Sequence, residues 1–335
     1  MNEVKRAAIA DAAPRRLSDL LLRWETILVV LLLAVIAGNT AISPYFLDIY
    51  NLSDATYNFS EKAIVALGMA LLILVGEIDL SVAAIIALGS LATGLLAQAG
   101  YGLPALLAAG PLVGVLCGMF NGFLVTHLAL PSIVVTIGTM SLFRGIAQVV
   151  LGDQVITQYP KNYTALGQDY LVLWPPLPWS FVIFLVFAVV FAAVLHMTAF
   201  GRRLYAIGNN AMASRFSGIP VDRIRFSLFV LTGALSGLAA TLLTARIGST
   251  RPNIALGWEL EIITMVILGG VSIAGGSGTI PGVVLAIFIL GLITFGLSLI
   301  NVPGIVISVI LGFLLIVSIA LPIVVRRLLA RGASA

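Results

Sequence analysis

Long apolar stretches separated by short polar segments repeat along almost the whole chain. A helix needs about 20 apolar residues to cross a hydrocarbon core of roughly 30 Å. Ten stretches approach that length, and we expect a transmembrane helix near each of residues 27–43, 62–76, 82–99, 105–126, 132–150, 179–198, 226–246, 258–275, 280–299 and 303–324. The pattern predicts an all-α, polytopic membrane helix bundle with about ten transmembrane helices.

These stretches leave no room for a separate soluble domain. We expect a leader at 1–26, a single transmembrane domain at 27–324 and a short tail at 325–335. A basic leader before an apolar run is also typical of a signal peptide. Because this leader is long and many apolar stretches follow it, a retained first transmembrane helix is the better interpretation.

Basic residues indicate the orientation of the bundle. The leader holds five Lys or Arg, the loop at 199–225 holds five and the tail holds three, so these segments contain 13 of the 18 basic residues. Lys and Arg accumulate in cytoplasmic segments of membrane proteins. An even number of helices also places both termini on one side. We therefore expect both termini and the 199–225 loop to be cytoplasmic.

The amino-acid composition excludes several classes of protein for this chain. With 60% hydrophobic and 10% charged residues, the chain has too little polar surface for a soluble globule. The formal net charge of +4 comes from residues that flank apolar stretches, so we expect membrane lipid and no nucleic acid as a partner. Cys117 has no second cysteine to pair with, and His127 and His196 are too far apart for a zinc-binding helix motif. We expect no metal and no cofactor.

The sequence also offers no ATP site. A P-loop places a lysine directly after its last glycine, and none of the three lysines, Lys5, Lys62 and Lys161, follows a glycine. The glycine-rich run at 275–278 is better interpreted as a tight turn between helices. No serine lies in a nucleophile elbow, so we expect a protein that is not an enzyme. Energy for any transport must come from a gradient or from another polypeptide.

Glycines indicate close helix packing in one stretch. Gly110, Gly114, Gly118 and Gly122 recur every four residues and lie on one helix face. A face without side chains lets a neighbouring helix approach closely. Gly233 and Gly237 repeat the spacing. These glycines predict helix contacts rather than ligand binding.

Two carboxylates interrupt the apolar stretches at Glu77 and Asp79, within the segment from Gly76 to Ser81. Because the two residues are only two positions apart, their side chains cannot lie on the same face of a helix. This spacing favours a broken or re-entrant segment. Irregular backbone occurs at membrane depth only where protein buries it or where it lines water. The segment then either borders a transport path or is an ordinary turn with Asp79 as a helix cap, and the sequence leaves both open.

A second polar group, Arg246, Arg251, Glu259 and Glu261, is expected at the outer mouth of the bundle. Its opposite charges either pair with one another or contact an extracytoplasmic partner. Arg144 falls inside the fifth apolar stretch and needs a carboxylate or a route to the surface. We expect its long side chain to reach the outer surface.

Several motifs occur in an order that resembles one known family. They are Gly76 to Ser81, Asn121-Gly122, Pro131, Thr136 to Thr139, Arg144-Gly145, Gly201-Arg202, Tyr205 to Asn209, Ser217 to Ile219, Ala245-Arg246, Ser249, Pro252, Gly257, Glu259-Leu260, Leu268 to Gly270, Ser272, Gly275-Gly276, Gly278 and Gly282. The chain resembles the permease subunits of bacterial ABC sugar importers of the ribose-type carbohydrate uptake family, and the motifs cover most of its length.

The resemblance implies an importer in the bacterial inner membrane. In such importers two permease copies or homologues form the path, two ATPase subunits bind beneath, and a periplasmic binding protein delivers the sugar. It implies a coupling helix at 209–218, which Asn209 or Asn210 can cap and Gly218 can end. The residues that we assign to coupling are Asn209, Asn210, Ala213, Arg215, Phe216, Ser217 and Gly218. Those assigned to the translocation path are Glu77, Asp79, Ser81, Asn121 and Thr139, and those assigned to binding-protein docking are Arg246, Arg251 and Glu259.

The chain departs from the family at two places. Glu77 stands where the family usually has glycine, and Ala211 and Met212 stand where the coupling segment often begins with an acidic residue. Glu77 makes the chain similar to rhamnose-type members, which favours a methylpentose or pentose, and the autoinducer-2 importers are similar as well. The alternative is a proton-coupled secondary carrier in which Glu77 and Asp79 exchange protons.

Overall fold

Each of the ten apolar stretches contains a helix in the structure, a computed structural model that describes residues 24–332. Residues 1–23 of the predicted leader lie outside the described part. The helices are α2 (Trp24–Ile42), α3 (Ile49–Leu74), α4 (Val82–Gln98), α5 (Leu103–Thr126), α6 (Ser132–Leu151), α7 (Lys161–Gln168), α8 (Trp179–Met197), α9 (Ala199–Asn209), α10 (Ala211–Phe216), α11 (Val221–Ile247), α12 (Trp258–Leu268), α13 (Ile280–Leu299) and α14 (Gly304–Gly332).

Seven of the described helices are long and apolar enough to cross a membrane. They are α2, α3, α5, α6, α8, α11 and α13. Helix α4 has 17 residues and α12 has 11, so both are shorter than a full span. The chain is therefore a polytopic helical membrane protein, and the total of about ten spans stays a prediction.

Helix boundaries differ most from the prediction in α3 and α12. Helix α3 begins at Ile49 rather than near residue 62, because the Asp48 carboxylate accepts hydrogen bonds from the backbone N–H groups of Tyr50 (2.9 Å) and Asn51 (3.3 Å). Helix α12 ends at Leu268, before Gly269-Gly270, whereas the apolar stretch continues to residue 275. Hydropathy alone detects neither the cap nor the glycine pair.

Helices α11 and α14 also extend beyond their apolar stretches. Helix α11 begins at Val221 and takes in part of the basic loop, and α14 continues to Gly332 through most of the predicted tail. Residues 151–178, which separate the apolar stretches at 132–150 and 179–198, have structure of their own. They contain α7 and an antiparallel hairpin of β1 (Tyr170–Leu173) and β2 (Pro176–Pro178), so the fold is not strictly all-α.

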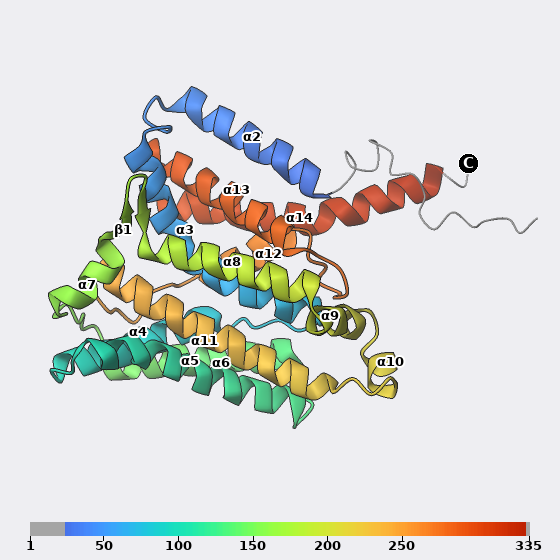
Figure 1. The fold of residues 1–335 in the computed structure, drawn as a ribbon, viewed down its shortest axis with the longest axis horizontal. Coiled ribbons are helices and arrows are strands. Elements are labelled where there is room, and N and C mark those ends of the chain that lie inside the picture. The colour runs from blue at the N-terminus through green and yellow to red at the C-terminus, as the bar shows by residue number, and fades with distance from the viewer. Residues whose placement is uncertain (1–23, 333–335) are drawn as a thin grey trace, which may run out of the picture.

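The helices lie side by side with their connections gathered at two ends (Figure 1). Helices α9 and α10 lie at one end, hereafter the α10 end, and α7 and the hairpin lie at the opposite, α7 end. Helix α2 begins and α14 finishes at the α10 end. Helix α2 lies outermost against α13, whereas α3 is almost wholly buried in the middle of the bundle.

The predicted glycine stripe on α5 packs against α11, the most extensive helix pair in the described structure. Gly110 lies against Gly237 and Gly114 against Gly233, so close that a Cβ on any of these four would collide with the facing backbone. Small residues at such crossings let two helices approach to backbone contact. The helix-contact interpretation of these glycines is confirmed.

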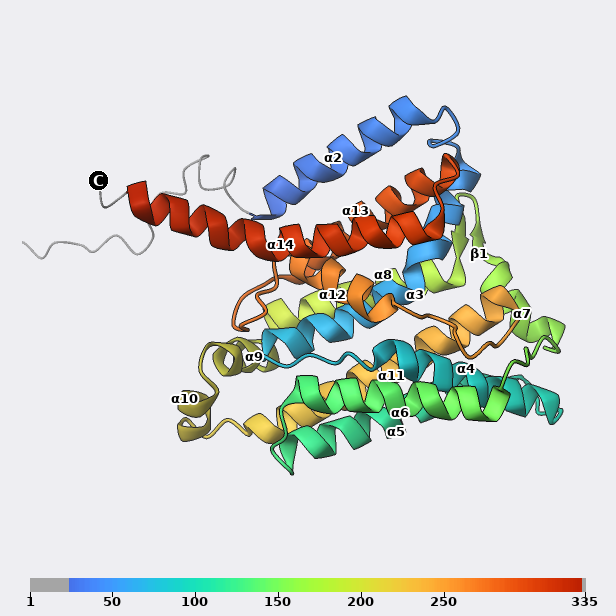
Figure 2. The same ribbon diagram turned by 180° about the vertical axis from the view of Figure 1, so that it is seen from behind.

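Between α3 and α4 the chain is not helical. Residues 75–81 run in extended and turn conformation from the α10 end back into the bundle, where α4 begins (Figure 2). Helix α3 ends in a Schellman motif, with the Glu77 N–H bonded to the Leu72 carbonyl at 3.1 Å and Gly76 at φ +82°. The predicted broken segment is confirmed.

Candidate translocation and coupling site

Asp79 is the centre of a buried polar cluster at the start of α4. Its carboxylate accepts hydrogen bonds from the backbone N–H (2.8 Å) and hydroxyl (2.6 Å) of Ser81. The Asn121 side chain on α5 donates to the Ser81 hydroxyl at 2.8 Å and to Asp79 at 3.4 Å. All three residues are completely buried. The positive end of the α4 dipole favours a carboxylate here, so Asp79 fixes the start of this short helix.

Glu77 faces a different neighbour. Its carboxylate forms an ion pair with Arg225 of α11 at 3.0 Å, with side chains 10% and 21% exposed respectively. Arg225 also donates to the Val75 carbonyl at 3.4 Å. Glu77 and Arg225 line a cavity of about 610 Å³ at the α10 end, together with Arg215 and Asp222. One arginine therefore satisfies both a carboxylate and a carbonyl that the broken backbone leaves unpaired.

Helix α6 closes the other side of the broken segment. The Ile78 N–H donates to the Ser132 hydroxyl at 3.5 Å, and the Thr136 hydroxyl lies 3.4 Å from the Ile78 carbonyl. Thr139 is buried one turn farther along α6, where its hydroxyl donates to the Thr136 carbonyl. Of the five predicted path residues, the structure therefore joins Asp79, Ser81 and Asn121 by hydrogen bonds and places Glu77 and Thr139 on either side.

The predicted coupling segment forms the short helix α10. The Asn210 side chain accepts a hydrogen bond from the Ala213 N–H at 2.9 Å, so Asn210 rather than Asn209 is the cap. Gly218 ends the helix at φ +81°, with the Ile219 N–H bonded to the Ser214 carbonyl. Met212 and Phe216, one turn apart, are 67% and 87% exposed. The helix thus presents an apolar face outside the bundle.

Helix α9 ties α10 to the glycine-rich turn at 275–278. Asn209 donates to the Gly276 carbonyl at 3.3 Å, and the Tyr205 hydroxyl donates to the Gly278 carbonyl at 2.7 Å. Burial raises the pKa of Tyr205, so its hydroxyl stays protonated as a donor at neutral pH. Gly208 lies against the Leu74 carbonyl and the Gly276 backbone. Helix α9, the end of α3 and the turn therefore pack as one unit.

An alternating chain of charges connects α10 to the broken segment. Arg215 of α10 pairs with Asp222 in the first turn of α11. Asp222 and Arg225 are three residues apart and so lie on one face of α11. Arg225 then pairs with Glu77. The sequence places all four residues but does not reveal this order, because their separations along the chain reach 148 positions.

The predicted docking group is divided. Arg246 forms an ion pair with Glu61 of α3 at 2.8 Å, and Glu261 pairs with Lys62 of α3 at 2.7 Å, so both partners come from α3 and not from the group itself. Glu259 is half-buried, whereas Arg251 is exposed near Asp153 in a surface cavity. Of the three predicted docking residues, Arg251 alone is exposed. The docking role of all three stays a prediction.

Arg144 is partly exposed, and backbone carbonyls rather than a carboxylate bind its guanidinium. Its guanidinium donates to the carbonyls of Pro252 (2.9 Å) and Ile254 (2.7 Å) and to that of Ala83 at 3.1 Å. Residues 248–257 have little regular structure, so their carbonyls lack helical partners. Arg144 supplies the missing donors. Carbonyl groups from a broken segment are partners that the sequence interpretation did not consider.

Sequence reasoning also missed Glu61 and Lys62 as paired residues. Both lie within an apolar helix, and an ionisable residue in such a helix is itself the signal that could have found them. Within residues 24–332, no group of three or more His, Cys, Asp or Glu side chains is arranged to hold a metal ion.

The chain matches a family model described as "Branched-chain amino acid transport system / permease component" over residues 51–319. Among curated proteins it is similar to the autoinducer 2 import system permease protein LsrD of Enterobacter sp. (strain 638), with 35% identity over 88% of this chain and 91% of the relative. LsrD of Salmonella paratyphi A is 34% identical and that of Escherichia coli (strain K12) 36%, each over 88% of this chain and 90% of the relative.

No solved structure matches the chain. The family match and the relatives extend over most of the chain and include both broken segments and the α9–α10 connection. They confirm the resemblance that the ordered motifs carry. The chain therefore belongs to this family of multi-pass inner-membrane permeases and is a permease subunit of the ribose-type ABC importers.

Proposed function

We propose that this permease imports a small, uncharged, hydroxyl-rich molecule of the autoinducer-2 type, energised by a separate ATPase subunit and supplied by a periplasmic binding protein. The names of the three LsrD relatives support the substrate class. A methylpentose such as rhamnose is the second candidate, supported by Glu77. The transmembrane domain at 27–324 would act with a second copy or homologue, with the leader, the α10 end and the tail in the cytoplasm.

The observation that carries the proposal is the exposed apolar face of α10 on a helix that is connected to the broken segment. Met212 and Phe216 offer an apolar contact for an ATPase subunit, beside the positive charge of Arg215. The predicted coupling residues Asn209, Asn210, Ala213, Ser217 and Gly218 would form and position this helix. Because the chain has no P-loop lysine, ATP-driven motion must enter through such a contact.

Motion of α10 would reach the path by two connections. One passes through α9 to the turn at 275–278 and the end of α3, by way of Asn209 and Gly208. The other passes through Asp222 and Arg225 to Glu77. Displacing α10 would thereby shift residues 75–81, and with them Asp79, Ser81 and Asn121, toward or away from the path.

The test is uptake by the permease reconstituted with the ATPase and binding protein of its own importer, using labelled autoinducer 2, rhamnose and ribose. We expect ATP-dependent uptake of autoinducer 2 that falls at least several-fold in Phe216→Ala, with the protein still inserted. The matched control is Phe313→Ala on α14, where the side chain is also exposed. Uptake without any ATPase subunit, or equal uptake by both variants, would contradict the proposal.

A proton-coupled carrier is the rival. In that mechanism Glu77 and Asp79 would bind and release protons, but Glu77 is held by Arg225 and Asp79 by Ser81 and Asn121. These contacts hold both carboxylates in one place, whereas a carrier needs carboxylates that are free to bind and release protons. Uptake that an ionophore abolishes while ATP is held constant would favour the rival.

A further inference from the structure

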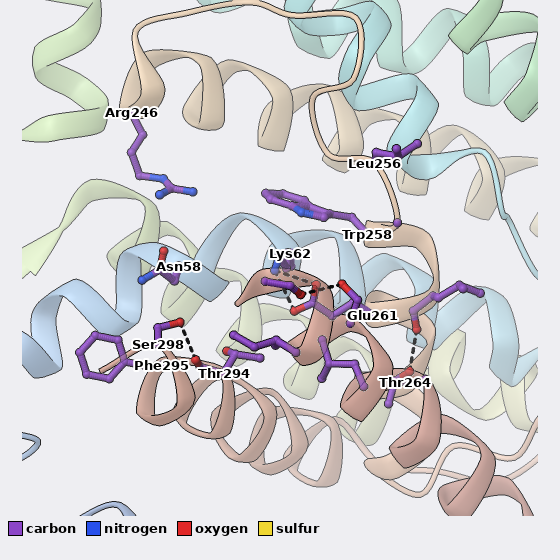
Figure 3. Close-up of a pocket in the computed structure, with 17 residues that line it drawn as sticks. Asn58, Lys62, Arg246, Leu256, Trp258, Glu261, Thr264, Thr294, Phe295 and Ser298 are labelled. Atoms are coloured by element: carbon purple, nitrogen blue, oxygen red, sulfur yellow. Dashed lines mark hydrogen bonds and ion pairs between the residues drawn. The ribbon is translucent and has the colours of Figure 1, made fainter. Parts of the chain in front are cut away.

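A second polar cavity lies away from the broken segment at 75–81, between α3, α12, α13 and α14 (Figure 3). Its volume is about 420 Å³, within the range of roughly 300–1,000 Å³ typical of small-molecule sites. Arg246 and Trp258 project toward one another across it (Figure 3). None of the residues assigned above to the translocation path lines this cavity.

The cavity wall is charged but electrically balanced. Lys62 contacts both carboxylate oxygens of Glu261 at 2.7 Å, and Arg246 is paired with Glu61. The Lys62 ammonium also lies 4.7 Å from the centre of the Trp258 ring. Because each cation already has its counter-ion, an additional charge on a ligand would lack a partner. The site therefore favours an uncharged ligand.

Hydroxyl groups supply the acceptors of this cavity. Thr294, Ser298 and Ser308 each donate their proton to a carbonyl of their own helix, at 2.8 to 3.1 Å. A hydroxyl that donates its proton in this way still has lone pairs that accept. These three side chains can therefore accept hydrogen bonds from a ligand.

Donors and an apolar surface complete the wall. Arg246 uses its Nε for Glu61, and its remaining guanidinium nitrogens have no hydrogen-bond partner among the described residues. Arg246 therefore supplies donors, and the indole of Trp258 supplies an apolar surface. A sugar-like ring presents this combination, with hydroxyl groups that both donate and accept at its edge and C–H groups on its faces.

We propose that this cavity, hereafter the Trp258 cavity, is a binding site for an uncharged, hydroxyl-rich molecule of sugar size. Arg246 then contacts the ligand rather than a binding protein, and Lys62 and Glu261 hold the Trp258 ring in place. The proposal rests on the proposed function, because it assigns to the transported class of molecule a site within the permease itself.

The experiment measures tryptophan fluorescence of the full chain in lipid nanodiscs, titrated with autoinducer 2, ribose and rhamnose, and with gluconate as a charged probe. We expect a saturable change with at least one uncharged probe, which is lost in Trp258→Phe. Thr294→Val removes one acceptor with little change in shape and should weaken binding roughly fivefold to tenfold. Gluconate should bind more weakly than the uncharged probes.

The matched control is Thr40→Val on α2, where the hydroxyl, like that of Thr294, donates to a carbonyl in the preceding helical turn but lies outside the cavity. It should bind as the unmodified chain does, and all variants should elute identically from a sizing column. No saturable change with any probe, or equal binding by Thr294→Val and Thr40→Val, would overturn the site. If ATP-driven uptake then persisted, the proposed function would stand without this cavity. Saturable binding in a protein that performs no ATP-driven uptake would instead support the cavity and contradict the function.

Discussion

Two non-helical segments interrupt the bundle, and they are held in different ways. Residues 75–81 follow α3 and residues 248–257 follow α11, and in each case the preceding helix ends at a glycine with positive φ, Gly76 at +82° and Gly248 at +64°. The first enters from the α10 end (Figure 2). The second starts at the α7 end, where Thr250 pairs with Ile156. One arginine from another helix fixes each segment.

The difference lies in what the arginine binds. Arg225 binds a carboxylate, Glu77, and one carbonyl, and it is connected through Asp222 to the exposed helix α10. Arg144 binds three carbonyls and forms no ion pair in the described structure. An ion pair at a cavity can open and re-form as helices shift, whereas several backbone bonds hold one geometry. The comparison predicts that residues 75–81 move during transport and that residues 248–257 do not.

The largest expected effect comes from Arg225→Ala. It leaves Glu77 nearly buried without its counter-ion, which should destabilise the protein by about 3 kcal/mol. We expect a clear fall in the melting temperature in detergent and loss of uptake. The double variant Arg225→Ala/Glu77→Gln removes both charges and should recover much of the stability. If the double variant were as unstable as the single one, the ion pair would not be what holds residues 75–81.

Arg144→Met should follow in magnitude. The methionine keeps the length of the side chain but leaves the carbonyls of Pro252 and Ile254 without their donor, at a cost of about 2–4 kcal/mol. The loss of Arg225 can be rescued by a second substitution of its carboxylate partner. The loss of Arg144 cannot be rescued in this way, because its partners are backbone groups. The melting temperature measures the loss, and Arg251→Met, at an exposed position, is the control that should leave it unchanged. Rescue by removing Glu259 would contradict this assignment.

A smaller effect is expected from Thr250→Val in the segment at 248–257. The Thr250 hydroxyl lies 2.7 Å from that of Ser90 and 2.6 Å from that of Tyr159, and it donates to the Ser90 carbonyl. Burial raises the pKa of Tyr159 to about 12, so its phenol remains a neutral partner at neutral pH. Removing the hydroxyl should cost about 1–2 kcal/mol in stability. Uptake per inserted protein should stay unchanged, and a large loss of uptake would show that this segment also moves.

The sequence predicted the two segments unequally. Glu77 and Asp79 are charges inside an apolar stretch, which is a local signal, and they located the broken segment at 75–81 before the structure did. Residues 248–257 are polar and flank an apolar stretch, so they were taken for part of an ordinary outer mouth. Hydropathy measures the polarity of a segment but not the depth at which it lies.

Partners were harder to predict than elements. The cap of α10 depends on Asn210 and a backbone N–H three residues away, and the sequence contains that information. The Glu61–Arg246 and Arg225–Glu77 pairs join residues 185 and 148 positions apart, because α11 packs against α3. Only the packed bundle brings them together. Arg144 was missed for a different reason, since backbone carbonyls carry no mark in the sequence.

The smallest effect on stability, with the most informative effect on transport, is expected from Arg215→Ala. Its ion pair with Asp222 joins side chains that are both 52% exposed, so the pair should contribute less than about 1 kcal/mol. The melting temperature should therefore barely change. Uptake should fall several-fold, because α10 loses one of its two connections to residues 75–81.

Arg223→Ala removes an equal charge two positions before Arg225 and serves as the control. If both variants reduce uptake equally, the positive charge of this end matters and the connection does not. If only Arg215→Ala does so, the segment at 75–81 is the one that α10 moves.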